Sequence, residues 1–149
     1  MEVAFYHCTR AKPLNVLPAL AEKALGAGYR ILVSVPDSDV AEAADEALWT
    51  YRADSFLPHA VASGDEADAE QPVLIASGFP TANDARLAMS LSNGLPAADT
   101  PFERVLLLFD GDDQEATEMA RRHWRALEGR EGVTRTYWQQ GERGWQKRS

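Results

Sequence analysis

The sequence predicts an α/β protein with a mainly parallel, Rossmann-like sheet flanked by helices. Short, continuously apolar runs recur along the chain, as expected for strands that are covered on both faces. Each of the first two runs is followed by a segment with apolar residues at helical spacing. Two strand–helix units in succession imply parallel strands joined by right-handed crossovers.

The first strand–helix unit begins with residues 3–8 (VAFYHC), whose β-branched and aromatic side chains predict a strand. A helix is expected to follow, because apolar residues recur at helical spacing: Leu17, Leu20, Ala21, Ala24 and Leu25. Gly26 and Gly28 suit the end of this helix.

The second unit begins with residues 31–35 (ILVSV), which predict a strand buried on both faces and ended by Pro36. The polar residues 37–39 offer N-caps for a second helix. The inner face of that helix is expected to carry Val40, Ala43, Ala44, Ala47 and Leu48.

The middle of the chain is less regular. Residues 62–71 are small and acidic without an apolar period, and they predict an exposed loop. A third strand is expected at residues 73–76 (VLIA). Residues 87–91 alternate between apolar and small or polar side chains, which favours a strand, although a short helix starting near Asn83 fits almost as well.

The last part of the chain contains its most apolar run, residues 105–109 (VLLLF), which predicts a central strand. Asp112 and Glu115 resemble a capping box at the start of a final helix. The inner face of this helix is expected to carry Ala116, Met119, Ala120, His123 and Leu127, with Gly129 after its end. Residues 133–139 are rich in β formers and predict the final strand.

The length and composition fit one globular domain spanning residues 1–149. The chain is 45% hydrophobic and 26% charged, which argues against a disordered protein. No apolar run approaches the roughly 20 residues that a membrane span needs. The first residues do not resemble a secretory signal, and the single cysteine, Cys8, cannot form an internal disulfide, so a cytoplasmic location is expected.

The charge is unevenly distributed. The net charge is -8, yet eight of the fifteen Lys and Arg residues lie from Arg121 onward, beside only three acidic residues. An acidic protein is a poor general ligand for nucleic acid, because it meets the phosphate backbone with net repulsion. A local basic face could still hold an acidic peptide, and the alternative is that these charges are simply solvated.

Nucleotide and metal chemistry have weak sequence support. The first strand-to-helix turn, residues 9–15, contains no glycine, whereas phosphate-binding turns need glycine for close backbone approach. Asp110, Asp112 and Asp113 follow a strand and could hold Mg²⁺ in a nucleotide- or Mg-dependent enzyme. The favoured interpretation is structural: Asp112 caps the last helix and Asp113 complements its dipole.

The remaining candidates for nucleophilic or zinc chemistry are His7, Cys8 and His59. Because His7 and Cys8 are neighbours on a strand, their side chains should point to opposite faces of the sheet. His59 has no candidate partner near it in sequence. Core or loop roles are therefore expected for all three, and no catalytic residue, metal or cofactor is predicted.

Two aromatic features point to partner binding. Arg121, Trp124 and Arg125 share one face of the last helix, and this face suits a short acidic peptide that ends in an aromatic residue with a free carboxylate. An equally good interpretation is that the indole packs on the sheet while the arginines form a solvated edge. The segment 45–59 places Trp49 near a helix end and Phe56 in a loop, either to seal the core or to bind a partner.

The chain resembles the chi subunit of bacterial DNA polymerase III. The most specific match is DEALW followed by SFLPH, within segment 45–59, and FYH, PVLI, VLLLF and YWQ support it in order and spacing. The resemblance implies an accessory subunit without catalysis. It would bind the psi subunit, which links it to the clamp loader, through Trp49 and Phe56. It would bind the acidic C-terminal tail of single-stranded DNA-binding protein through Arg121, Trp124 and Arg125.

Direct binding of single-stranded DNA is a further alternative, in which Trp138 and Trp145 of the basic C-terminal segment would stack on bases. The overall acidity counts against it, so little or no direct DNA binding is expected.

Overall fold

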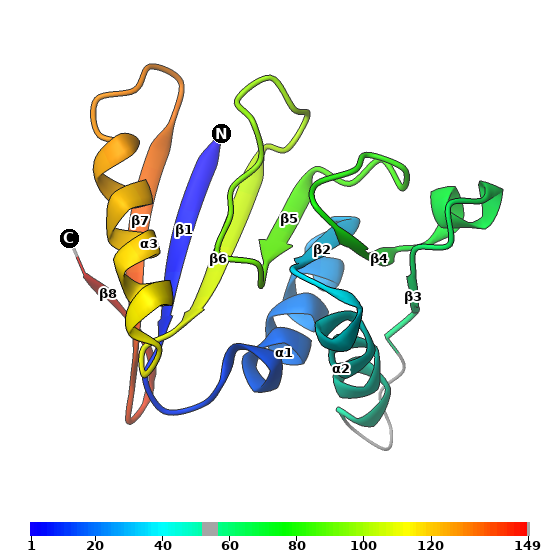
Figure 1. Cartoon of the computed structure of the whole chain (residues 1–149), viewed down its shortest axis with the longest axis horizontal. Coiled ribbons are helices and arrows are strands. Elements are labelled where there is room, and N and C mark those ends of the chain that lie inside the picture. Colours follow the sequence, from blue (N-terminus) through cyan, green and yellow to red (C-terminus); the bar gives the residue numbers. More distant parts are fainter. Residues whose placement is uncertain (52–56, 149) are drawn as a thin grey trace.

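The computed structural model describes residues 1–51 and 57–148. The described residues form one eight-stranded sheet in the order β3-β4-β2-β5-β6-β1-β7-β8 (Figure 1). The strands are β1 (Glu2–Cys8), β2 (Ile31–Val35), β3 (His59–Val61), β4 (Val73–Ser77), β5 (Leu87–Ser90), β6 (Arg104–Asp110), β7 (Thr134–Gly141) and β8 (Gly144–Arg148). Every neighbouring pair is parallel except β7 with β8, so the predicted mainly parallel α/β fold is confirmed.

Helices cover both faces of this sheet. They are α1 (Pro13–Gly26), α2 (Ser38–Thr50) and α3 (Gln114–Ala126). Alternate residues of a strand point to opposite faces. Ala4, Tyr6 and Cys8 of β1 therefore belong to the core under α1 and α2, whereas Val3 and Phe5 belong to the core under α3. In Figure 1, α3 lies across β7 and β1, at the opposite end of the sheet from α2.

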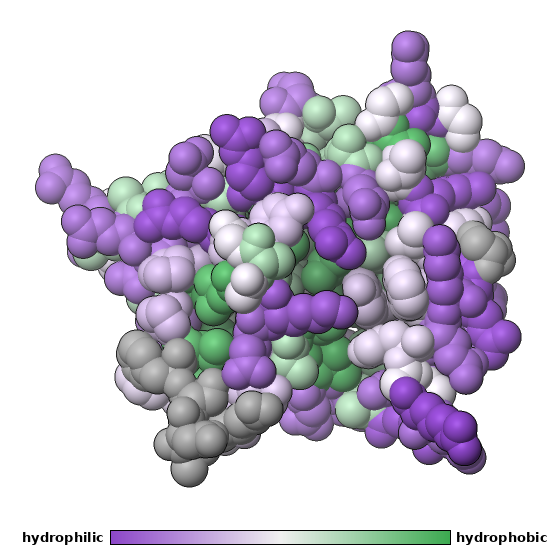
Figure 2. Space-filling view, turned by 180° about the vertical axis from the view of Figure 1, so that it is seen from behind, coloured by the Kyte–Doolittle hydropathy of each residue, from purple (hydrophilic) through white to green (hydrophobic). Residues whose placement is uncertain are grey.

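The interior strands follow the sequence prediction closely. All five residues of β2 are buried, as expected for a run covered on both faces. β6 lies between β5 and β1, and its residues Val105–Phe109 are buried, which confirms the expected central strand. Leu87–Ser90 form β5, so the strand interpretation of that segment was the correct one. Figure 2 shows the opposite side of the molecule from Figure 1, where hydrophobic residues occupy small areas within a mostly hydrophilic surface.

The segment 62–71 is mostly exposed, as predicted, but it is not a simple loop. It contains a short 3-10 helix, Glu66–Glu70, within which Asp68 is buried. The Asp68 carboxylate accepts hydrogen bonds from the Ser63 and Gly64 backbone N–H groups and from the Ser63 hydroxyl. These backbone hydrogen bonds lower the pKa of Asp68. The Asp68 carboxylate thus holds its own segment together through these hydrogen bonds, although the composition of the segment is typical of a loop.

The cap of α3 also differs from the prediction, because Asp113 rather than Asp112 is the N-cap. The Asp113 carboxylate accepts a hydrogen bond from the Ala116 N–H at 3.2 Å. The Asp112 N–H instead donates to the Asp110 carboxylate at 2.9 Å, which closes a turn before the helix. This turn moves the helix start one residue along the chain.

Two strands were not predicted from the sequence. β3 is only three residues long and pairs with β4 at one edge of the sheet. β8 forms the other edge by folding back on β7 in an antiparallel hairpin. Gly144 follows the two-residue turn and has a φ of 108°, a conformation that favours glycine. None of the described helices is long and apolar enough to cross a membrane.

Candidate functional site

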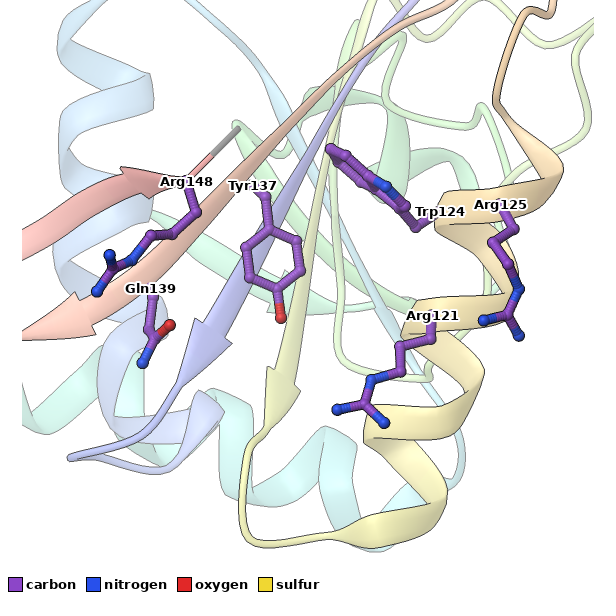
Figure 3. A pocket seen from close by; sticks show the side chains of 6 residues that line it. All are labelled: Arg121, Trp124, Arg125, Tyr137, Gln139 and Arg148. Atoms are coloured by element: carbon purple, nitrogen blue, oxygen red, sulfur yellow. The ribbon is translucent and has the colours of Figure 1, made fainter.

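A groove of about 510 Å³ lies between α3 and the β7–β8 hairpin. We call it the basic groove, and it is lined by Arg121, Trp124, Arg125, Tyr137, Gln139 and Arg148. Figure 3 shows Arg121 and Arg125 on α3 and Arg148 on the hairpin at the other side of the groove, with Tyr137 between them. The structure therefore brings Arg121, Trp124 and Arg125 to one site, as the sequence predicts.

The indole of Trp124 is fixed in the wall of the groove. It makes edge contacts with Phe5 and Tyr137, at centroid distances of 5.3 and 5.7 Å. The guanidinium of Arg135 lies 4.0 Å from the centre of its ring, in a cation–π contact, and also donates to the Trp124 carbonyl oxygen. The indole thus packs on the sheet and lines the groove at once, which combines the two interpretations that the sequence left open.

The arginines of the groove keep their charge available. Arg121 and Arg125 are exposed, and among residues 1–51 and 57–148 neither has a carboxylate within ion-pair distance. The Arg148 guanidinium donates to the Gln146 side-chain oxygen, a neutral group, at 3.4 Å. Guanidinium groups bind carboxylates in a planar, bidentate geometry. Three such groups around an aromatic wall suit an anionic ligand that carries an apolar ring.

The positive field of Arg121 reaches the floor of the groove. The Tyr137 hydroxyl lies 3.0 Å from Nδ1 of His7, whose ring stacks on Phe109. Burial lowers the pKa of His7, and Arg121 lowers it further. Burial raises the pKa of Tyr137, and Arg121 partly opposes that shift. The floor of the groove is therefore expected to be neutral near pH 7.

A histidine titration followed by NMR tests this electrostatic description. His7 is expected to titrate below its ordinary pKa of 6.5. Arg121→Gln should raise that pKa by removing a positive charge, whereas Arg122→Gln, on the same helix but outside the groove, should change it less. Because the pKa is lower in the folded state than in the unfolded state, the contribution of His7 to stability is complete above about pH 6.5. It is lost as the pH falls through the folded-state pKa.

An unchanged His7 pKa in Arg121→Gln would contradict the proposed reach of the Arg121 charge. His7→Gln should also flatten the dependence of the melting temperature on pH between neutral and mildly acidic conditions.

A second exposed aromatic surface lies on the other face of the sheet. Trp49, at the end of α2, is 57% exposed, and its ring makes an edge contact with His59 at 5.1 Å. His59 Nε2 lies 3.0 Å from the Asp45 carboxylate, so the histidine ring lies beside α2. Val61 of β3 is also exposed. Phe56, which the sequence pairs with Trp49, lies outside the described residues.

The model of the family described as DNA polymerase III chi subunit, HolC, matches residues 1–134. The chain belongs to the DNA polymerase III chi subunit family. DNA polymerase III subunit chi from Pseudomonas aeruginosa is 35% identical over 106 residues, which cover 69% of this chain and 72% of that protein. The chain is accordingly an accessory subunit for DNA replication.

The acidic residues at the end of β6 and just after it have structural roles in this chi family member. The Lys12 ammonium lies 2.9 Å from the Asp110 carboxylate and 3.6 Å from that of Asp112, while Asp113 caps α3. Burial would raise the pKa of Asp110, but the hydrogen bonds from Lys12 and from the Asp112 N–H lower it on balance. The described residues contain no group of three or more His, Cys, Asp or Glu side chains placed to hold a metal ion.

The turn between β1 and α1 is arranged differently from a phosphate-binding loop. The Gln140 side-chain oxygen accepts hydrogen bonds from the Arg10 and Ala11 backbone N–H groups, each at 3.0 Å. The Thr9 hydroxyl donates to the Gln140 carbonyl oxygen at 2.7 Å. These two backbone donors are thus occupied by the side chain of a neighbouring strand.

The other candidates also lie in structural positions. His7 and Cys8 point to opposite faces of the sheet as expected, and burial raises the pKa of Cys8 to about 12, far from that of a reactive thiolate. Trp138 and Trp145 pack against Tyr6, at centroid distances of 6.3 and 4.9 Å. These contacts disfavour the alternative in which both indoles stack on single-stranded DNA.

Three residues of the basic groove were missed from the sequence: Tyr137, Gln139 and Arg148. Period-two alternation along the predicted final strand could have placed Tyr137 and Gln139 on one face. Arg148 could not be placed without the hairpin, since its position follows from pairing opposite Tyr137. The useful signal for that hairpin was the pair Gly141 and Gly144 around two polar residues.

Proposed function

We propose that the chain is a non-catalytic adaptor with two separate binding surfaces. The basic groove binds the acidic C-terminal tail of single-stranded DNA-binding protein, and the residues Trp49 and Phe56 bind the psi subunit. Psi in turn links the chain to the clamp loader. The observation that carries the first part is the set of three arginines, free of carboxylate partners among the described residues, around a fixed indole.

Tail binding would combine two physical contributions. Arg121 and Arg125 bind carboxylates of the tail, and the terminal aromatic ring rests against Trp124. The tail loses chain entropy on binding and few groups are buried, so the affinity is modest. Since Trp124 is already held by Phe5, Tyr137 and Arg135, this wall of the groove needs no ordering when the tail binds.

Psi binding would use exposed apolar surface on the opposite side of the sheet. An exposed tryptophan is a frequent centre of a protein–protein interface. Trp49 fits this role because more than half of its surface is accessible, whereas Leu48 of the same helix is buried. The separation of α2 from α3 in Figure 1 leaves room for both partners on one molecule.

Salt dependence tests the electrostatic part of the proposal. Affinity for an acidic peptide that ends in phenylalanine should fall at least about tenfold between low salt and 0.5 M salt, because exposed charges are screened. Isothermal titration calorimetry measures this directly, and the same peptide with asparagine in place of aspartate is the control. An affinity that is equally high for both peptides and independent of salt would contradict capture by the arginines.

A further inference from the structure

A second depression continues the basic groove around the end of the β7–β8 hairpin. It has a volume of about 760 Å³ and shares Gln139 and Arg148 with the basic groove. We call it the hairpin groove, and the residues that matter for its chemistry are Arg10, Glu142, Arg143, Gln146 and Arg148. Two depressions that share lining residues form one continuous surface.

The two grooves together are strongly basic on a protein whose net charge is -8. Five arginines line them: Arg10, Arg121, Arg125, Arg143 and Arg148. Among the described residues that line the two grooves, Glu142 is the single acidic side chain, and its carboxylate lies 3.6 Å from the Arg10 guanidinium. Both partners of that pair are largely exposed, so the pair is weak and easily exchanged for another carboxylate.

Several lining residues of this surface are spaced along the length of the β7–β8 hairpin. Tyr137, Gln139 and Gly141 alternate along β7, and four residues of strand cover about 13 Å. Gln146 lies opposite Gln139, and its side chain would be only 3.1 Å from a Cβ at position 141. The small size of Gly141 therefore lets the Gln146 amide lie across the hairpin, where it can pair with the main chain of an extended peptide.

We propose that an acidic peptide bound in the basic groove continues into the hairpin groove. This inference rests on the proposed function: the terminal aromatic residue sits beside Trp124, and aspartates upstream of it pair with Arg148, Arg143 and Arg10, displacing Glu142. Arg143 and Arg148 lie beyond the part of the chain that the family model matches, whereas Arg10 lies within it.

Two synthetic peptides test the inference. Both end in phenylalanine with a free carboxylate; the short one has a single aspartate before that residue, and the long one adds a run of aspartates upstream. The unmodified protein should bind the long peptide more tightly. Arg10→Gln/Arg143→Gln should lower the affinity for the long peptide about three- to tenfold and leave the affinity for the short one unchanged. Glu142→Gln should raise the affinity for the long peptide about twofold.

The matched control is Arg130→Gln/Lys147→Gln, which removes the same charge outside both linings. The inference would be overturned if the control and test variants lose affinity equally. It would also be overturned if a variant loses affinity equally for the short and long peptides. Either result would leave the proposed function standing. If the unmodified protein binds neither peptide, the proposed function itself fails. Circular dichroism melts of each variant show whether the hairpin is intact.

Discussion

Replacing Arg121 and Arg125 together with glutamate is expected to weaken binding of an acidic tail peptide at least about 100-fold. The change removes two guanidinium groups from the same wall of the basic groove and places two negative charges there instead. Attraction becomes repulsion, while Trp124 keeps its contacts with Phe5, Tyr137 and Arg135. Calorimetric titration of the peptide against the variant measures the loss.

The matched control is Arg122→Glu/Arg130→Glu. Arg122 lies on the same helix and Arg130 follows it, both are exposed, and neither lines the basic groove. This control changes the net charge by the same amount. Because neither residue lines the basic groove, it should lower the affinity far less. Psi should bind both variants normally. If the Arg121→Glu/Arg125→Glu variant binds the peptide with unchanged affinity, the tail-binding site does not lie on this face of the protein.

Trp49→Ala is expected to weaken psi binding about 30-fold or more, since a central tryptophan commonly dominates an interface. The melting temperature should change little, because the indole is 57% exposed in the free protein. The change removes the edge contact with His59, while the contact between His59 and Asp45 stays in place. Surface plasmon resonance with immobilised psi, together with thermal melts, separates binding from folding.

Phe56→Ala extends the same test to the second residue that the sequence assigns to psi binding. We expect weaker psi binding with an unchanged melting temperature. A sharp fall in melting temperature would show instead that Phe56 belongs to the core. Loss of acidic-peptide binding by Trp49→Ala would contradict the separation of the two surfaces.

Local patterns were sufficient to predict much of this fold. The apolar runs of β2 and β6 needed no tertiary information, because strands covered on both faces are apolar throughout. The helical face of α3 was equally clear, since Ala116, Ala120 and Leu127 are buried at the spacing that the sequence shows. The positions of Arg121, Trp124 and Arg125 on one side followed from the same periodicity.

Features that depend on long-range contacts could not be predicted in this way. Arg148 enters the basic groove only because β8 folds back to place it opposite Tyr137. Asp68 is buried because its carboxylate binds the backbone of Ser63 and Gly64, which loop composition does not reveal. The choice of Asp113 over Asp112 as the cap depends on the turn that Asp110 closes. In each case a hydrogen bond or strand pairing decides between similar local patterns.

The most direct test of two independent binding surfaces is a two-by-two comparison. The acidic tail peptide and psi are each titrated against Arg121→Glu/Arg125→Glu and against Trp49→Ala. We expect the arginine variant to bind psi but not the peptide, and Trp49→Ala to bind the peptide but not psi. Loss of both partners by either variant, or of neither by both, would contradict this expectation.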